Sequence, residues 1–147
     1  MKGLKYHITM FIVMVVFGML FNPMNVLAYR FNDLYFSQTL FYGGLLMASN
    51  MIWAHEIVHV IAMGKMNYKL FIFGILLSIS ITIFLLRKQF IVNDNQWLKR
   101  MISHHSTALT TSHNIYKKTN NPRIKKLSKE IIDTQEREIS EMKSMII

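Results

Sequence analysis

The chain of 147 residues contains no cysteine, only two prolines and only six glycines. Without cysteine it has neither disulfides nor thiolate metal ligands, which excludes a disulfide-stapled domain. The scarcity of glycine and proline excludes a collagen-like chain. Charged residues are also few, at 17% against 52% hydrophobic residues, and this balance excludes an intrinsically disordered chain.

Several sequence signals of catalysis and nucleic-acid binding are missing as well. The sequence has no phosphate-binding loop, no dinucleotide fingerprint and no nucleophile with a placed base, so no catalytic site is expected in its C-terminal part. The net charge is +9, but the basic residues lack the dense clustering with aromatics that marks a nucleic-acid surface. We therefore expect no nucleic-acid partner, and a binding protein rather than an enzyme.

Long apolar runs dominate the first 92 residues, which hold only 7 of the 17 Lys and Arg and 2 of the 8 acidic residues. A soluble core of this size could not bury such runs, so lipid is the expected partner. Their lengths predict an all-α membrane region, residues 1–92, with spans at about 8–28, 39–63 and 70–86.

The first run has a second interpretation. Lys2 and Lys5 precede an apolar stretch that ends in small residues, a pattern that also suits a signal peptide cleaved after Ala28. We expect an uncleaved membrane anchor, with cleavage as the alternative.

Basic residues flanking the runs predict the orientation of a multi-pass protein in an inner or plasma membrane. Lys2 and Lys5 precede the first run, and Lys65 and Lys69 separate the second from the third, which favours both segments as cytoplasmic and the C-terminal domain as extracytoplasmic. The basic residues that follow the third run argue for the opposite orientation.

The polar tail, residues 93–147, carries two amphipathic patterns. Asn93 offers an N-cap to a first helix, and Asn121-Pro122 starts a second after a short turn. Both helices repeat apolar residues every three or four positions, which predicts an antiparallel αα-hairpin domain. Two helices cannot enclose their shared seam alone, so we expect oligomerisation into a bundle or packing on the spans.

Three stretches of this tail form a recognisable order of motifs. They read Met101-Ile102-Ser103-His104-His105-Ser106-Thr107-Ala108-Leu109, then Asn121-Pro122, then Ile131-Ile132-Asp133-Thr134-Gln135-Glu136-Arg137-Glu138-Ile139-Ser140-Glu141-Met142-Lys143. In these features the tail resembles the domain of unknown function 305 family. The resemblance implies a ferritin-like, generally extracytoplasmic hairpin that binds copper through Met and His, beside copper-transport or copper-resistance partners.

Two positions depart from that family pattern. Ser103 stands where a proline is frequent, and Thr111 stands where a methionine often follows. The second departure leaves open a weaker site, or a site completed by His113 or by another subunit.

The candidate metal ligands lie on facing surfaces of the two tail helices. Copper(I) is soft and accepts thioether and imidazole donors, which 12 methionines and 6 histidines supply, with zinc as the alternative metal. The residues that we assign to the site are Met101, His104, His105 and Met142, with Gln135 and Glu138 as accessory ligands. The competing interpretation makes His105 a core histidine bonded to Gln135 or Glu138, and Met142 a packing residue.

The second span carries a further candidate site. His55-Glu56-Ile57-Val58-His59 matches the H-E-x-x-H pattern of zinc proteases, but the third span offers no Asp, Glu or His as a third ligand. Met47 and Met51 precede the histidines at steps of four, which suggests instead a stripe that relays copper(I). The alternative is that His55 and His59 only join helices by hydrogen bonds.

The expected function is therefore copper sequestration, hand-over or tolerance by a membrane-anchored, homo-oligomeric protein. The alternatives are a structural or interaction module without metal and, less favoured, a minimal intramembrane zinc metalloprotease that uses His55, Glu56 and His59.

Overall fold

The computed structural model describes residues 2–146, and within this range its regular elements are all helices, joined by short irregular segments, without a strand. The chain divides into two compact units. The first comprises Met1–Leu20 and Gln38–Val92, and the second comprises Phe21–Ser37 and Asn93–Ile147. Residues 21–37, which lie between the two parts of the first unit in the sequence, therefore belong with the C-terminal helices.

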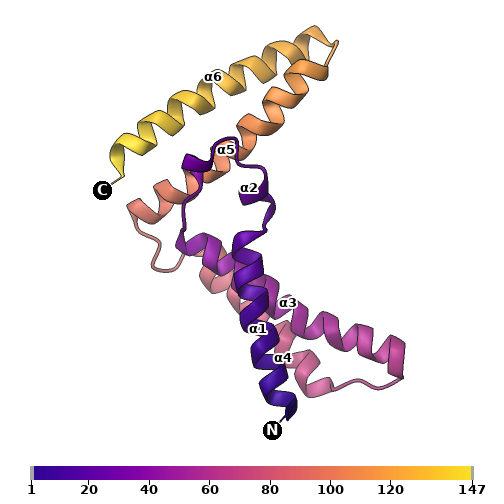
Figure 1. Ribbon diagram of the computed structural model, residues 1–147. Coiled ribbons are helices and arrows are strands. Elements are labelled where there is room, and N and C mark those ends of the chain that lie inside the picture. Colours follow the sequence, from indigo (N-terminus) through magenta and orange to yellow (C-terminus); the bar gives the residue numbers. More distant parts are fainter. Residues whose placement is uncertain (1, 147) are drawn as a thin grey trace. The chain divides into compact units, whose positions relative to one another are not determined.

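The first unit contains the long apolar helices. They are α1 (Lys2–Leu20), α3 (Gln38–Met63) and α4 (Tyr68–Ser80), and α4 continues as the π-helix η2 (Ile81–Arg87). In this unit α3 packs against both α1 and α4 (Figure 1). Three segments, Lys5–Val26, Gln38–Met63 and Tyr68–Arg87, are long and apolar enough to cross a membrane. The three predicted spans thus have the required length and composition, with ends that differ from the prediction by a few residues. The first is interrupted after Leu20, and its last part, α2 (Pro23–Val26), belongs to the second unit.

Glycines let α1 and α3 approach closely. A β-carbon added to Gly44 would lie 2.8 Å from the main-chain oxygen of Val15, and one added to Gly18 would lie 3.0 Å from the α-carbon of Gly44. The adjacent Gly43 has open space at the same position. Small residues at a crossing bring helix backbones into direct contact, which is how helices associate without a hydrophobic driving force in lipid.

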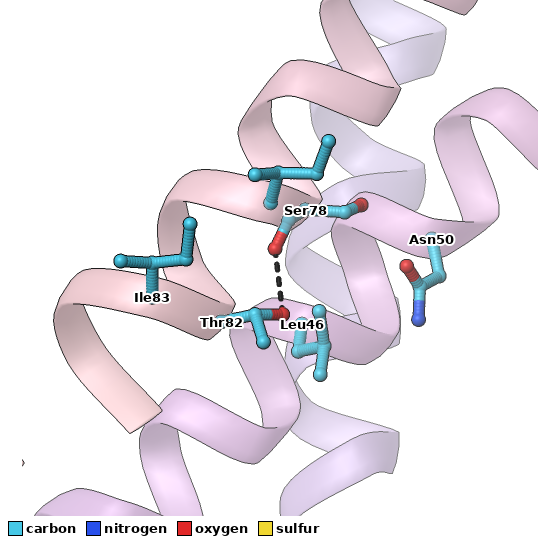
Figure 2. A pocket seen from close by; sticks show the side chains of 6 residues that line it. Leu46, Asn50, Ser78, Thr82 and Ile83 are labelled. Atoms are coloured by element: carbon cyan, nitrogen blue, oxygen red, sulfur yellow. Dashed lines mark hydrogen bonds between the residues drawn. The ribbon is translucent and has the colours of Figure 1, made fainter. Parts of the chain in front are cut away.

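Buried hydroxyl groups join α3 to α4. Ser78 Oγ lies 3.0 Å from Ser49 Oγ and 2.9 Å from the main-chain oxygen of Gly74. Thr82 donates its hydroxyl hydrogen to the main-chain oxygen of Ser78 at 2.8 Å (Figure 2). The adjoining hollow of about 270 Å³ is lined by Leu46, Asn50, Ser78, Ile79, Thr82 and Ile83. The hydroxyls of Ser78 and Thr82 are both used in contacts between or within the helices. The hollow therefore offers a mainly apolar surface.

The second unit is built on two long helices, α5 (Asp94–Lys118) and α6 (Pro122–Met145). Asn93 and Asn121 cap them, since their side-chain oxygens accept hydrogen bonds from the main-chain N–H groups of Gln96 at 3.0 Å and Arg123 at 2.9 Å. The two helices lie side by side along their length (Figure 1). Their shared core consists of Leu98, Ile102, Leu109, Ile132, Ile139 and Met142.

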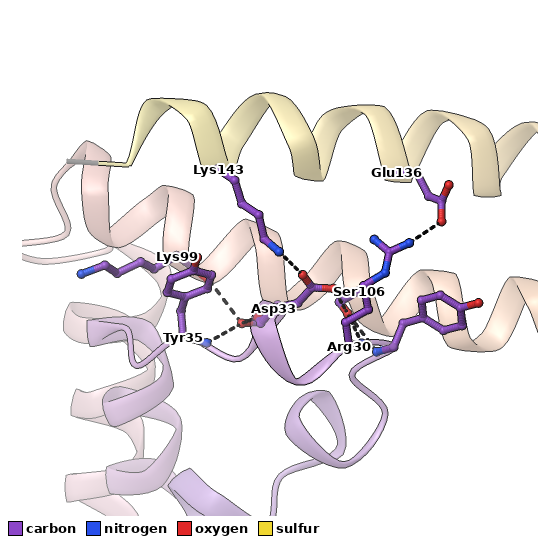
Figure 3. Close-up of polar contacts among 9 residues, drawn as sticks. Arg30, Asp33, Tyr35, Lys99, Ser106, Glu136 and Lys143 are labelled. Atoms are coloured by element: carbon purple, nitrogen blue, oxygen red, sulfur yellow. Dashed lines mark hydrogen bonds and ion pairs between the residues drawn. The ribbon is translucent and has the colours of Figure 1, made fainter.

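Residues 21–37 pack on this helix pair through Asp33, whose side chain is 0% exposed. Its carboxylate accepts a hydrogen bond from Ser106 of α5 at 2.7 Å and pairs with Lys143 of α6 at 2.5 Å (Figure 3). The main-chain oxygen of Asp33 accepts a further hydrogen bond, from Ser103, at 2.8 Å. One buried carboxylate therefore connects the segment to both helices.

Other contacts extend the same attachment on either side of Asp33. Arg30 pairs with Glu136 of α6 at 2.8 Å, and the ring of Tyr29 stacks on His113 at a centroid distance of 4.7 Å. The short helices of the segment, α2 (Pro23–Val26) and η1 (Phe31–Asp33), both contact α5. We call residues 21–37 the clamp segment.

Replacing Asp33 by Ala should destabilise the second unit by about 2–4 kcal/mol, because the change leaves Lys143 partly buried without its partner. Asp133 is the matched control, since it forms an exposed pair with Lys129 on α6 and its loss should cost less than about 1 kcal/mol. Thermal unfolding of the full chain in detergent, followed by circular dichroism, measures both. Equal effects for the two variants would contradict the role given to Asp33.

Gly44→Ala should destabilise the α1–α3 contact by about 1–3 kcal/mol, since the new methyl group meets main-chain atoms that cannot move aside alone. Gly43→Ala should change stability by no more than about 1 kcal/mol, because its methyl group enters open space. Unfolding of both variants in mixed micelles compares them directly, and a similar loss for Gly43→Ala would argue against close backbone contact at Gly44.

Candidate metal centre

A groove of about 310 Å³ lies between α5 and α6 and gathers most of the predicted ligands. The residues that line it are Trp97, Leu98, Met101, His105, Glu138, Glu141, Met142 and Met145. Met101, His105, Glu138 and Met142 belong to the predicted site, and the groove brings them together. His104 and Gln135 are not among its lining residues.

His105 is held by acceptors at both ring nitrogens. Its Nδ1 lies 2.9 Å from the main-chain oxygen of Met101, and its Nε2 lies 2.9 Å from a carboxylate oxygen of Glu138. Carbonyl and carboxylate oxygens only accept, so both contacts are hydrogen bonds when both nitrogens carry hydrogen. A metal at Nε2 would have to displace that hydrogen and the contact with Glu138. This contact with Glu138 is also the one that the competing interpretation, in which His105 is a core histidine without a metal, predicts.

His104 lies beside the groove rather than in it. Its exposed ring has its centre 5.9 Å from that of His105, at an interplanar angle of 65°. Partial desolvation lowers the pKa of His104 below its usual value, and the nearby positive charges of His105 and Arg100 lower it further. The neutral ring that this favours near pH 7 keeps a lone pair available for a metal.

The groove also contains donors that the sequence reasoning did not select. Met145 adds a third thioether beside Met101 and Met142, and Glu141 adds a second carboxylate. The spacing of three between Met142 and Met145 on one helix face was the available signal. That spacing points to the groove only when the register of α5 and α6 is known, because the register places Met142 and Met145 opposite Met101 and His105.

The groove favours soft-metal chemistry over a zinc site. Among residues 2–146 no group of three or more His, Asp or Glu side chains is placed to hold a metal ion. Structural and catalytic zinc sites use several such ligands, whereas thioethers select copper(I). The donors in the groove are therefore of the kind that the sequence predicts for copper(I).

In the second span, the motif residues are engaged in helix-end contacts. Glu56 is 4% exposed and accepts a hydrogen bond from the main-chain N–H of Asn67 at 2.9 Å. His59 Nδ1 lies 2.7 Å from the main-chain oxygen of Lys65, and His55 Nδ1 lies 3.7 Å from Glu56. Glu56 and His59 thus bind the loop between α3 and α4.

The remaining members of the predicted stripe are partly exposed. Met47 is 45% exposed and Met51 37% exposed, and Met47 packs against Gly18 of α1. The rings of His55 and His59 lie 6.2 Å apart in a stacked arrangement. The relay and protease interpretations both remain predictions.

Comparison with known proteins gives two matches. A family model described as a domain of unknown function (DUF305) matches residues 86–146. Uncharacterized protein L153 of Acanthamoeba polyphaga mimivirus is 37% identical over 125 residues, which covers 85% of this chain and 81% of that protein. This similarity therefore extends beyond the family model into the apolar helices. No solved structure matches the chain significantly.

The environment of His104 predicts a pH dependence. Its lowered pKa means that the unfolded chain binds more protons than the folded chain between about pH 6.5 and the folded pKa, so stability should fall as the pH drops across this window and level off below it. An NMR titration of the histidine rings should give His104 a midpoint below that of an unfolded peptide. Arg100→Gln should raise that midpoint without fully restoring it, because desolvation is the larger cause. A midpoint at or above the peptide value would contradict this description.

Proposed function

This chain belongs to the DUF305 family, and from that premise we propose that it is a membrane protein that binds copper(I) in the groove between α5 and α6. The observation that carries the proposal is the convergence of three methionines and one histidine on one groove. Thioether and imidazole together form a soft donor set that retains copper(I) without cysteine. The proposed ligands are Met101, His105, Met142 and Met145, with His104 at the rim.

Glu138 would act by holding the imidazole in place before the metal arrives. Its carboxylate fixes the ring of His105 from one side, while the main-chain oxygen of Met101 fixes it from the other. Binding at Nε2 would replace the contact with Glu138, and the freed carboxylate would remain beside the cation.

The proposal includes the arrangement of the whole chain. The α5–α6 pair would be a ferritin-like hairpin on the outer side of an inner or plasma membrane, anchored by the apolar helices. Homo-oligomerisation would cover exposed apolar residues of the pair, among them Ile115 and Leu127. Such a protein would sequester copper or hand it to a transporter or copper-resistance partner, and the proposal requires no catalytic step.

The test is an anaerobic copper(I) titration of the full chain in detergent, in competition with a chromophoric chelator. His105→Ala and the double variant Met101→Leu/Met142→Leu should each weaken binding about 10-fold or more, because each removes direct donors. X-ray absorption of the copper-loaded chain should detect sulfur ligands, and the double variant should have fewer of them.

Two matched controls stand outside the groove. His113→Ala removes a histidine of α5 that stacks on Tyr29, and Met14→Leu removes a methionine of α1. Both should leave affinity unchanged, and zinc(II) tested in parallel should bind more weakly. If the groove variants bind copper(I) as the unmodified chain does, the copper proposal fails, and the groove is then better described as the docking surface of an interaction module.

A further inference from the structure

A second pair of histidines meets in the first unit, where His7 of α1 lies beside His55 of α3. Their ring centres are 6.1 Å apart and their planes are nearly perpendicular, at 84°. Tyr6 contacts both rings, at 5.4 Å from His7 and 6.3 Å from His55. The H-E-x-x-H pattern marks His55 but not His7, because 48 residues separate the two.

Both histidines have a buried nitrogen without a hydrogen-bond partner. His7 Nδ1 and His55 Nδ1 are shielded from solvent, and neither forms a hydrogen bond. The nearest carboxylate oxygen to His55 Nδ1, from Glu56, lies 3.7 Å away and is beyond hydrogen-bond distance. Leaving a buried polar atom unpaired is costly, so two such atoms on adjacent rings point to a missing ligand.

The separation of the rings fits one ion held between them. Two metal–imidazole bonds of about 2.0 Å, with about 1.2 Å from each nitrogen to its ring centre, place the centres roughly 6.4 Å apart when the bonds are collinear. The observed separation is 6.1 Å. We propose that His7 and His55 form a two-coordinate copper(I) site between α1 and α3, through their Nδ1 atoms.

Copper(I) is the metal of choice for a site with so few ligands. Zinc would require further His, Asp or Glu ligands, and no group of three such side chains suited to a metal occurs among residues 2–146. Imidazole is a suitable copper ligand, and the buried carboxylate of Glu56 would offset the positive charge nearby. The site does not depend on the groove between α5 and α6.

His59 differs from the proposed pair in its contacts. Its Nδ1 donates to the main-chain oxygen of Lys65, and its ring stacks on that of His55, whereas His7 and His55 meet nearly at right angles. The proposed pair thus differs from the H-E-x-x-H pair, which combines His55 with His59. This difference supplies a matched control variant.

The position of the pair indicates the side from which copper would arrive. Gly18 meets Gly44 and His7 meets His55, so α1 and α3 run antiparallel in one register. The histidines lie at the end of the helices that is flanked by Lys2, Lys5, Lys65 and Lys69. The lysines predict that this end faces the cytoplasm.

The experiment uses a full-length chain in which the groove is disabled by Met101→Leu, His104→Ala and His105→Ala. In detergent, this chain should still bind one silver(I) or copper(I) ion in an anaerobic competition titration. Adding His7→Ala or His55→Ala should lower the affinity at least about 10-fold, whereas adding His59→Ala should leave it unchanged. Circular dichroism checks that each variant keeps its helices.

X-ray absorption of the groove-disabled chain keeps the proposal testable if a histidine variant does not fold. The proposed site predicts two nitrogen ligands in a near-linear arrangement, without sulfur. Binding that survives His7→Ala, binding that depends on His59, or a sulfur-rich spectrum would each overturn it. If the unmodified chain binds copper(I) at His7 and His55 but not in the groove, the proposed function fails and this site stands.

Discussion

The buried carboxylate of Asp33 is the interaction on which the second unit depends. Two helices bury only the side chains between them, and an amphipathic pair leaves the flanks of its seam open to water. Here the clamp segment covers part of that seam, because Asp33 binds Ser106 of α5 and Lys143 of α6 at once. A residue far away in the sequence thereby ties the two helices to each other, in the register that their shared core adopts.

That register decides which donors share the groove. With α5 and α6 aligned as they are, His105 meets Glu138, and Met101 lies in the same groove as Met142 and Met145. The ring of His105 is already oriented by two acceptors, so little ordering of this side chain remains for metal binding. The chain holds its soft donors on helices rather than loops, which suits a site that keeps a fixed shape.

The two candidate sites differ in whether their histidine nitrogens already have hydrogen-bond partners. The groove combines thioethers with an imidazole that already has partners, so a metal there would replace the hydrogen bond to Glu138. At His7 and His55 the buried Nδ1 atoms form no hydrogen bond, and a cation would satisfy both of them. Glu56, buried beside them, holds the following loop through Asn67.

The sequence alone determined the helices and their ends, because these follow from local chemistry. Asn93 and Asn121-Pro122 mark helix starts by their own hydrogen bonds and backbone limits, and apolar runs mark the candidate spans by length. It also selected Met101, His105, Glu138 and Met142. Only the tertiary structure decided that Asp33 clamps α5 to α6, that Met145 joins the groove and that His7 meets His55. These contacts join residues distant in sequence, and no local pattern encodes which of them become neighbours.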